Sequence, residues 1–172
     1  MSSARSILAR AVLLPALLIG LAACQLRPLY APSAGSAGPQ ADLPAITVDT
    51  PLTRPEQVFR NALLFSLRGG GDGQSPRYGL VYRMTVREQE IAVERGTGTP
   101  NAYQLVGGVS FLLKDAGTGA SLFGTSVTAI DTYTRSSQNY ANVRARRDAE
   151  DRLAKVLAEL TQARLAAYFA TN

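Results

Sequence analysis

Three segments between residues 78 and 133 alternate apolar and polar side chains, and this pattern constrains the fold more than any other feature of the sequence. In the first segment one side is apolar and carries Tyr78, Leu80, Tyr82, Met84 and Val86. The opposite side carries polar residues such as Arg83 and Arg87. A period of two is typical of half-buried β-strands. The phase then changes at Ile91 and Val93, which predicts a β-bulge or a twist near residues 88–90.

The second and third alternating segments follow a glycine-bearing loop at residues 95–100. The second segment has one regularly spaced side, made by Tyr103, Leu105, Gly107, Val109, Phe111 and Leu113. A turn at 115–119 predicts a hairpin into the third strand, residues 122–133. A shorter strand is expected earlier, at 45–49.

Two helices complete the predicted fold. For the first, Thr53 is the expected N-cap, Glu56 lies in the first turn, and the glycines after Arg68 end the helix. The second helix spans about 140–169 and has apolar residues on one side. Its other side predicts four ion pairs at a spacing of four: Arg147–Asp151, Asp148–Arg152, Asp151–Lys155 and Lys155–Glu159.

The predicted elements follow the order strand, helix, strand, strand, strand, helix. This order indicates an α+β fold, in which two helices pack on one face of a mainly antiparallel four-stranded sheet. The opposite face of the sheet would then be uncovered.

The N-terminus has the features of an export signal. Arg5 and Arg10 precede an uncharged run that closes with Leu21-Ala22-Ala23-Cys24. The run is too short to span ~30 Å of hydrocarbon as a helix, but it fits a signal-peptide core. Small residues before the chain's single cysteine are typical of bacterial lipoprotein signals, in which the thiol receives diacylglycerol. We therefore expect Cys24 to be the lipidation site; the alternative is an ordinary cleaved signal with a chance cysteine.

This interpretation divides the chain into three parts. Residues 1–23 are the cleaved signal peptide, 24–44 a lipidated flexible tether rich in Pro, Gly and Ala, and 45–172 a single α+β domain. Attachment would be by diacylglycerol and an N-acyl chain on Cys24, because two or more acyl chains anchor stably. Gln25 after the cysteine, rather than Asp, favours the periplasmic side of the outer membrane.

Composition excludes several classes of function. The chain has no histidine and one cysteine, which removes disulfides, most zinc sites and histidine-assisted nucleophiles. Catalysis by carboxylates alone remains formally open, but Glu88, Glu90 and Glu94 lie at a polar strand end and tryptophan is absent. The glycine run at 69–73 lacks the Gly-Lys-Ser/Thr of a phosphate loop. We expect no enzyme activity, no metal and no cofactor other than the covalent lipid.

The charge of the mature chain bears on its partners. Loss of the signal leaves 16 basic and 13 acidic residues, and almost all the basic ones are arginine. A lipid-anchored envelope protein with this small excess has neither the access nor the concentrated basic face that nucleic-acid binding needs. We therefore expect no nucleic-acid partner.

Pieces of the mature chain resemble one known family. The chain would begin Cys24-Gln25-Leu26-Arg27-Pro28-Leu29-Tyr30, and it continues with Tyr103-Gln104-Leu105, Tyr133, Tyr140-Ala141 and Asp148-Ala149. These pieces resemble the LPS-assembly lipoprotein family, LptE, particularly its alphaproteobacterial members, and the start is the most distinctive piece. The resemblance implies an outer-membrane lipoprotein that plugs and helps assemble the lipopolysaccharide-inserting β-barrel, LptD, and that binds lipopolysaccharide itself.

The resemblance also implies two basic contacts with lipopolysaccharide. One lies in the turn before the Tyr-Gln strand, where Arg95 stands, and the other near the start of the last helix, where Arg144 is the best match. Arg146 and Arg147 are close enough to compete for the second assignment. Arginine suits lipid A phosphates because its guanidinium binds phosphate bidentately. The alternative is that these are solvated surface arginines.

Two other functions remain open. In one, the chain is an auxiliary lipoprotein of an envelope lipid or solute ABC transporter. In the other, it is a structural lipoprotein that binds peptidoglycan or another envelope protein. If the partner is the barrel, we expect the uncovered sheet face and the loops 95–100 and 115–119 to meet its polar lumen.

Overall fold

The computed structural model describes residues 39–93 and 100–171. Cys24 and Arg95 therefore lie outside the described residues. The described chain forms α2 (Pro39–Asp42), η1 (Leu43–Ala45), β1 (Ile46–Val48), α3 (Arg54–Arg68), β2 (Tyr78–Val93), β3 (Pro100–Asp115), β4 (Ser121–Thr134) and α4 (Asn139–Thr171). From β1 onward this is the predicted order, and the predicted α+β class is confirmed; α2 and η1 were not predicted.

The four strands form one sheet in the order β1-β2-β3-β4. β1 pairs with β2 in parallel, whereas β2–β3 and β3–β4 are antiparallel. The register between β2 and β3 shifts between Glu90 and Ala92 and again before Val93. The predicted bulge is therefore present, at the far end of the 88–90 interval and just beyond it.

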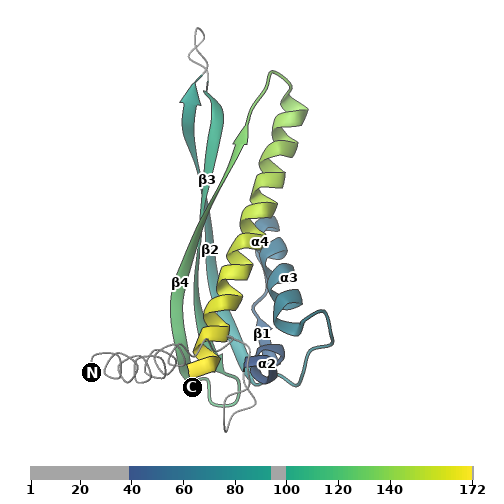
Figure 1. Cartoon of the computed structure of the whole chain (residues 1–172), viewed down its shortest axis with the longest axis vertical. Coiled ribbons are helices and arrows are strands. Elements are labelled where there is room, and N and C mark those ends of the chain that lie inside the picture. Colours follow the sequence, from purple (N-terminus) through teal and green to yellow (C-terminus); the bar gives the residue numbers. More distant parts are fainter. Residues whose placement is uncertain (1–38, 94–99, 172) are drawn as a thin grey trace, which may run out of the picture.

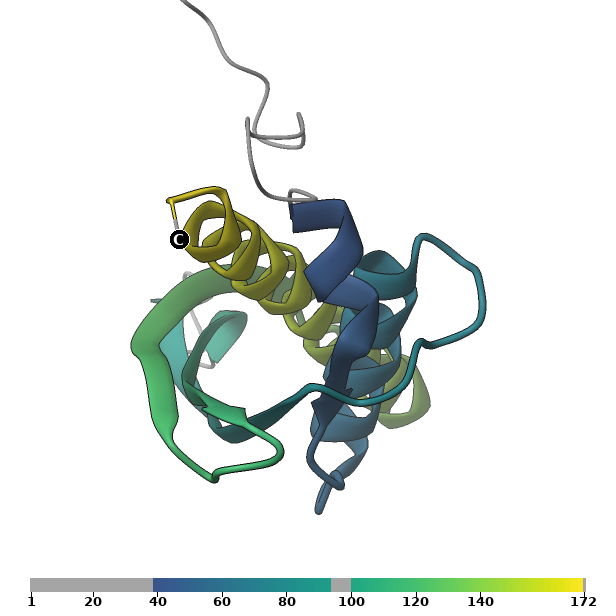
Figure 2. The same cartoon turned by 90° about the horizontal axis from the view of Figure 1, so that it is seen from below.

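Both long helices cover the same face of the sheet. Figure 1 shows α4 running the length of the strands with α3 beside it, and Figure 2 shows the sheet curling round this pair. The core between the layers is aliphatic and aromatic and includes Phe59, Leu63, Leu105, Leu153 and Leu157, all fully buried. Burial of such side chains is the main driving force for this packing.

A glycine sets the distance between α4 and the sheet. A Cβ on Gly107 of β3 would lie 2.9 Å from side-chain carbons of both Leu153 and Leu157. That separation is shorter than van der Waals contact, so α4 can approach β3 this closely only because residue 107 has no side chain.

The ends of α3 form as the sequence predicts. The backbone N–H of Glu56 donates to the Thr53 hydroxyl, and the Glu56 carboxylate accepts from the backbone N–H of Thr53 at 3.3 Å, which completes a capping box. The helix ends at Gly69, whose φ of 60° is left-handed.

The described part of the expected tether, residues 39–44, packs on the domain. Leu43 is buried, the hydroxyl of Tyr78 donates to Asp42 at 3.2 Å, and Arg77 pairs with Asp42 at 2.7 Å. The packed chain therefore begins before the boundary expected at residue 45.

The charged side of α4 follows the predicted ion pairs only in part. Arg152 pairs with Asp148 as expected, and it also binds Asp131 of β4 at 2.9 Å. Asp151 instead binds Arg54 of α3 through two hydrogen bonds of 2.7 and 2.8 Å. The charges thus connect α4 to neighbouring elements as well as along its own axis.

Candidate functional site

The first three turns of α4 extend beyond the packed core. The buried residues of the helix begin at Ala149, and the turns before it carry Arg144, Arg146 and Arg147. This end of α4 lies beside the upper ends of the long strands in Figure 1. These three arginines stand within four consecutive residues.

The connection from β4 to α4 is held by the side chain of Asn142. Its carbonyl oxygen accepts from the Ser136 backbone N–H, and its amide donates to the Ser136 carbonyl, both at 2.8 Å. The Arg135 backbone N–H donates to the Asn101 carbonyl of β3 at 2.8 Å. These bonds position the start of α4 against the sheet although few apolar contacts do so.

Arg135 is stacked on the strand ends. Its guanidinium lies 4.2 Å above the ring of Tyr103 and donates to that residue's hydroxyl at 3.1 Å. Tyr103 in turn stacks on Tyr133 with ring centres 5.4 Å apart. The cation–π contact fixes the position of the guanidinium over the rings.

Glu88 of β2 neutralises part of this cluster. Its carboxylate accepts from the Tyr133 hydroxyl at 2.8 Å, pairs with Arg146 at 3.1 Å and lies 3.6 Å from Arg135. Burial, and then the hydrogen bond to Glu88, raises the pKa of Tyr133 above its ordinary value. Arg146 pairs with Glu150 as well, at 3.1 Å, so its charge is satisfied within the protein.

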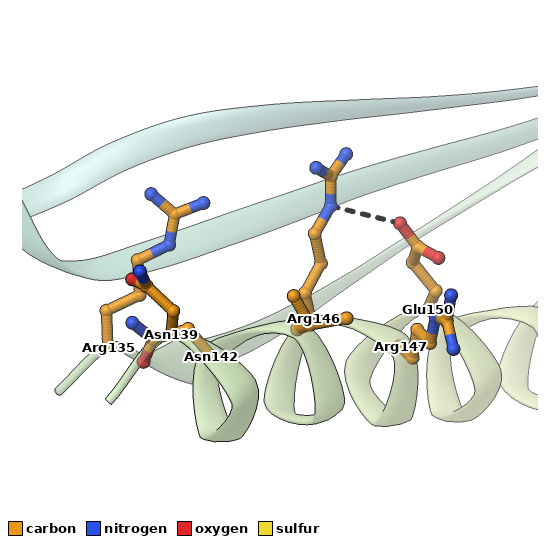
Figure 3. A pocket seen from close by; sticks show the side chains of 7 residues that line it. Arg135, Asn139, Asn142, Arg146, Arg147 and Glu150 are labelled. Atoms are coloured by element: carbon orange, nitrogen blue, oxygen red, sulfur yellow. Dashed lines mark hydrogen bonds and ion pairs between the residues drawn. The ribbon is translucent and has the colours of Figure 1, made fainter. Parts of the chain in front are cut away.

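Two pockets flank the first turns of α4. The larger, about 450 Å³, lies on the strand side and is lined by Arg135, Asn139, Asn142, Val143, Arg146, Arg147 and Glu150. Figure 3 shows Arg146 reaching from the helix toward the strands and its bond to Glu150. The smaller, about 270 Å³, is lined by Arg54, Tyr140, Val143, Arg144, Arg147, Asp148 and Asp151.

The smaller pocket is lined by an exposed stripe of four residues, Tyr140, Val143, Arg144 and Arg147. Two of them, Val143 and Arg147, also line the larger pocket. The spacing places all four on one side of the helix. Tyr140 is 76% exposed and Val143 50%. Neither Arg144 nor Arg147 forms an ion pair with a described residue. The stripe combines guanidinium groups that no described carboxylate pairs with and an exposed apolar surface, which suits an anion attached to an apolar group.

The structure therefore separates the three arginines that the sequence leaves in competition. Within the described part of the chain Arg144 and Arg147 have no ion-pair partner, whereas Arg146 pairs with Glu88 and Glu150. The role of Arg135 is not predictable from the sequence, because it depends on Tyr103, which is close to it only in the folded sheet. The stripe was not predicted either, although the helical spacing of residues 140, 143, 144 and 147 is a signal that could have revealed it.

The fold is that of known bacterial lipoproteins. A lipoprotein of Caulobacter crescentus CB15 is 27% identical with a TM-score of 0.64, over 79% of this chain and 98% of that one. The minor lipoprotein of Acinetobacter baumannii is 19% identical with a TM-score of 0.55, over 71% and 90%. Rare lipoprotein B of Shewanella oneidensis is 12% identical with a TM-score of 0.52, over 72% and 92%. The last two comparisons bear on the fold alone.

The family follows from the sequence of the domain itself. The family model of LptE, lipopolysaccharide-assembly, matches residues 41–165. The chain belongs to the LptE family, as the resemblance predicts. No curated protein matches this chain by sequence. Within residues 39–93 and 100–171, no helix has the length and apolar character needed to cross a membrane.

Proposed function

We propose that this protein is a non-enzymatic lipoprotein of the outer membrane that binds lipopolysaccharide and plugs the barrel LptD, whose assembly it assists. The lipid on Cys24 would hold it on the periplasmic side. Membership of the LptE family, matched over residues 41–165, is the observation that carries the proposal. The exposed stripe on α4 supplies chemistry that suits the ligand.

Lipid A offers phosphates beside acyl chains, so a binder needs fixed cations next to apolar surface. Arg144 and Arg147 provide uncompensated guanidinium groups, and Tyr140 and Val143 provide the apolar surface. Arg135, held over Tyr103, adds a further cation on the strand side. Arg95, in the segment that joins β2 to β3, is proposed as a further contact on the resemblance alone.

The test is a binding assay with purified lipopolysaccharide at controlled salt. Arg144→Ala combined with Arg147→Ala, and Arg95→Ala combined with Arg144→Ala, should each weaken binding. Two charge-assisted bonds of ~1.5–3 kcal/mol at most imply a loss of about tenfold or more. The matched control is Lys155→Ala with Arg164→Ala, which removes equal charge from exposed positions of the same helix. Unchanged affinity in the test variants would mean that these arginines are ordinary solvated residues and do not contact lipopolysaccharide.

The barrel partner is tested by extraction of outer membranes in mild detergent. We expect the wild-type protein to co-purify with LptD. Recovery of inner-membrane transporter subunits alone would favour the ABC-transporter alternative, and recovery of peptidoglycan-associated proteins alone would favour a structural role.

The lipid anchor is tested by Cys24→Ala. We expect the variant protein to leave the membrane fraction and the domain to remain folded, because the core is built from residues 43 and beyond. A near-UV circular dichroism spectrum without tertiary signal would contradict this separation of anchor and domain.

A further inference from the structure

The face of the sheet turned away from α3 and α4 carries charge of one sign only. Alternation along the strands and the pairing of Arg83 with Ser110 and of Arg87 with Val106 define this side, here called the open face. Its charged residues are Arg83, Arg87 and Lys114, and no Asp or Glu is present among the described residues of this face. None of the three cations forms an ion pair in the described part of the chain.

The carboxylates of the described strand residues lie on the helix side, and two of them, Glu88 and Asp131, are paired there with cations. Glu88 binds Arg146 and Tyr133, and Asp131 binds Arg152. The mature chain as a whole has nearly balanced charge, with 16 basic and 13 acidic residues. The positive character of the open face therefore arises from segregation between the two faces, since the composition alone does not produce it.

The open face also has a shape suited to close contact. The sheet curls round the helices in Figure 2, so this face is convex. Its middle is low in relief, because one cross-strand row is Thr85, Gly108 and Thr128. Val81 and Ile130 add apolar surface and are 42% and 61% exposed.

We infer that the open face docks against an acidic, concave stretch of the inner wall of the barrel partner, with Arg83 and Arg87 as the main charged contacts. The inference rests on the proposed function, which supplies the barrel. A barrel wall seen from inside is concave and polar, which complements a convex, hydroxyl-rich cationic face. An anionic bilayer is flat and would touch this curved sheet along a narrow strip, and the face lacks the large aromatic side chains that insert at lipid interfaces.

The experiment uses the full-length lipidated chain co-expressed with its LptD. Arg83→Glu with Arg87→Glu should reduce the co-purified barrel about tenfold or more, because repulsion replaces attraction at two neighbouring positions. The control is Lys155→Glu with Arg164→Glu on exposed sites of α4, which should leave recovery unchanged. Arg83→Gln with Arg87→Gln gives a milder second variant if reversal impairs folding, and thermal midpoints check all proteins.

The outcomes distinguish this inference from the proposed function. Failure of the wild-type protein to recover LptD overturns the proposed function, and this inference with it. Recovery of LptD by the wild type and equally by both open-face variants overturns the inference alone. Loss of binding to phosphatidylglycerol vesicles with barrel recovery unchanged also overturns it, in favour of a lipid surface. Selective loss of the barrel in the open-face variants, together with lower recovery by the wild type in high salt, supports it.

Discussion

The two parts of α4 differ in what their side chains do. From Ala149 onward the helix buries a continuous apolar side, including Leu153, Leu157 and Leu165, against α3 and the sheet. Before Ala149 none of its residues is buried, and the helix presents arginines beside Tyr140 and Val143. One element thus supplies stability in its later turns and a candidate binding surface in its first ones. A long helix anchored at one end holds charges in fixed positions without burying them.

The largest expected effect is the loss of Leu157, at the centre of the packed part. Leu157→Ala should lower the free energy of unfolding by ~2–5 kcal/mol, because it removes buried methyl groups and leaves a cavity. Val143→Ala, in the exposed part, should change it by less than ~0.5 kcal/mol. Urea denaturation of both variants measures the difference. Similar losses at both positions would show that the first turns are part of the core.

The next effect concerns the contact between the packed part of α4 and β3. Gly107→Ala should destabilise by ~1–3 kcal/mol, since its Cβ would overlap Leu153 and Leu157. Gly108→Ala is the matched control on the open face, where the nearest atom to a Cβ is 3.5 Å away. Thermal melts should separate the two variants. An equal shift in both would mean that the backbone conformation of glycine, rather than the approach of α4, matters at residue 107.

Much of this architecture is predictable from the sequence because its determinants are local. Alternation in 78–133, the Thr53 cap and the Gly69 end each depend on residues a few positions apart, and each appears as expected. The partner of Asp151 was not predictable in this way. A spacing of four offers Arg147 and Lys155, whereas the observed partner, Arg54, is brought close only when α3 packs on α4.

The candidate site was predictable to a smaller extent. The position of basic residues near the start of α4 could be inferred, but not which of them is free. That distinction depends on Glu88, a residue of β2 that pairs with Arg146, whereas no described carboxylate pairs with Arg144 or Arg147. The burial of Leu43 was also not predictable, because a Pro- and Ala-rich segment gives no periodic signal that its last residues pack on the domain.

A smaller effect is expected for two tyrosines of the sheet, one in the core and one near the candidate site. Tyr82 packs on Phe59, and its buried hydroxyl has no hydrogen-bond partner among residues 39–93 and 100–171. The Tyr133 hydroxyl, in contrast, donates to Glu88 near the candidate site. Tyr133→Phe should therefore cost about 1 kcal/mol at neutral pH, and Tyr82→Phe should be neutral or slightly stabilising. Chemical denaturation at pH 7 compares them. A large loss in Tyr82→Phe would mean that its hydroxyl has a partner after all.

Tyr82 should also make the stability of the protein depend on pH. Burial raises the pKa of Tyr82 from 10.0 to about 12. The unfolded chain therefore loses this proton first, so wild-type stability should fall as pH rises from about 10 toward about 12. Tyr82→Phe should lessen that fall in stability. The rest of the fall should persist, because burial also raises the pKa values of Tyr78 and Tyr133. Identical alkaline melting profiles for wild type and Tyr82→Phe would contradict this assignment.

The smallest effect lies at the boundary between the two parts of α4, where Asp151 meets Arg54. The pair is bidentate, but the side chains are 49% and 28% exposed. Solvent screening should therefore hold its coupling to ~0.2–1 kcal/mol despite the good geometry. A double-mutant cycle with Arg54→Ala and Asp151→Ala measures that coupling directly. A coupling energy within this range that falls with added salt would support apolar burial, from Ala149 onward, as the main force that holds α3 and α4 together. A clearly larger coupling energy would mean that charge pairing fixes the start of the packed region. Substitutions in the arginine stripe should then also change the free energy of unfolding.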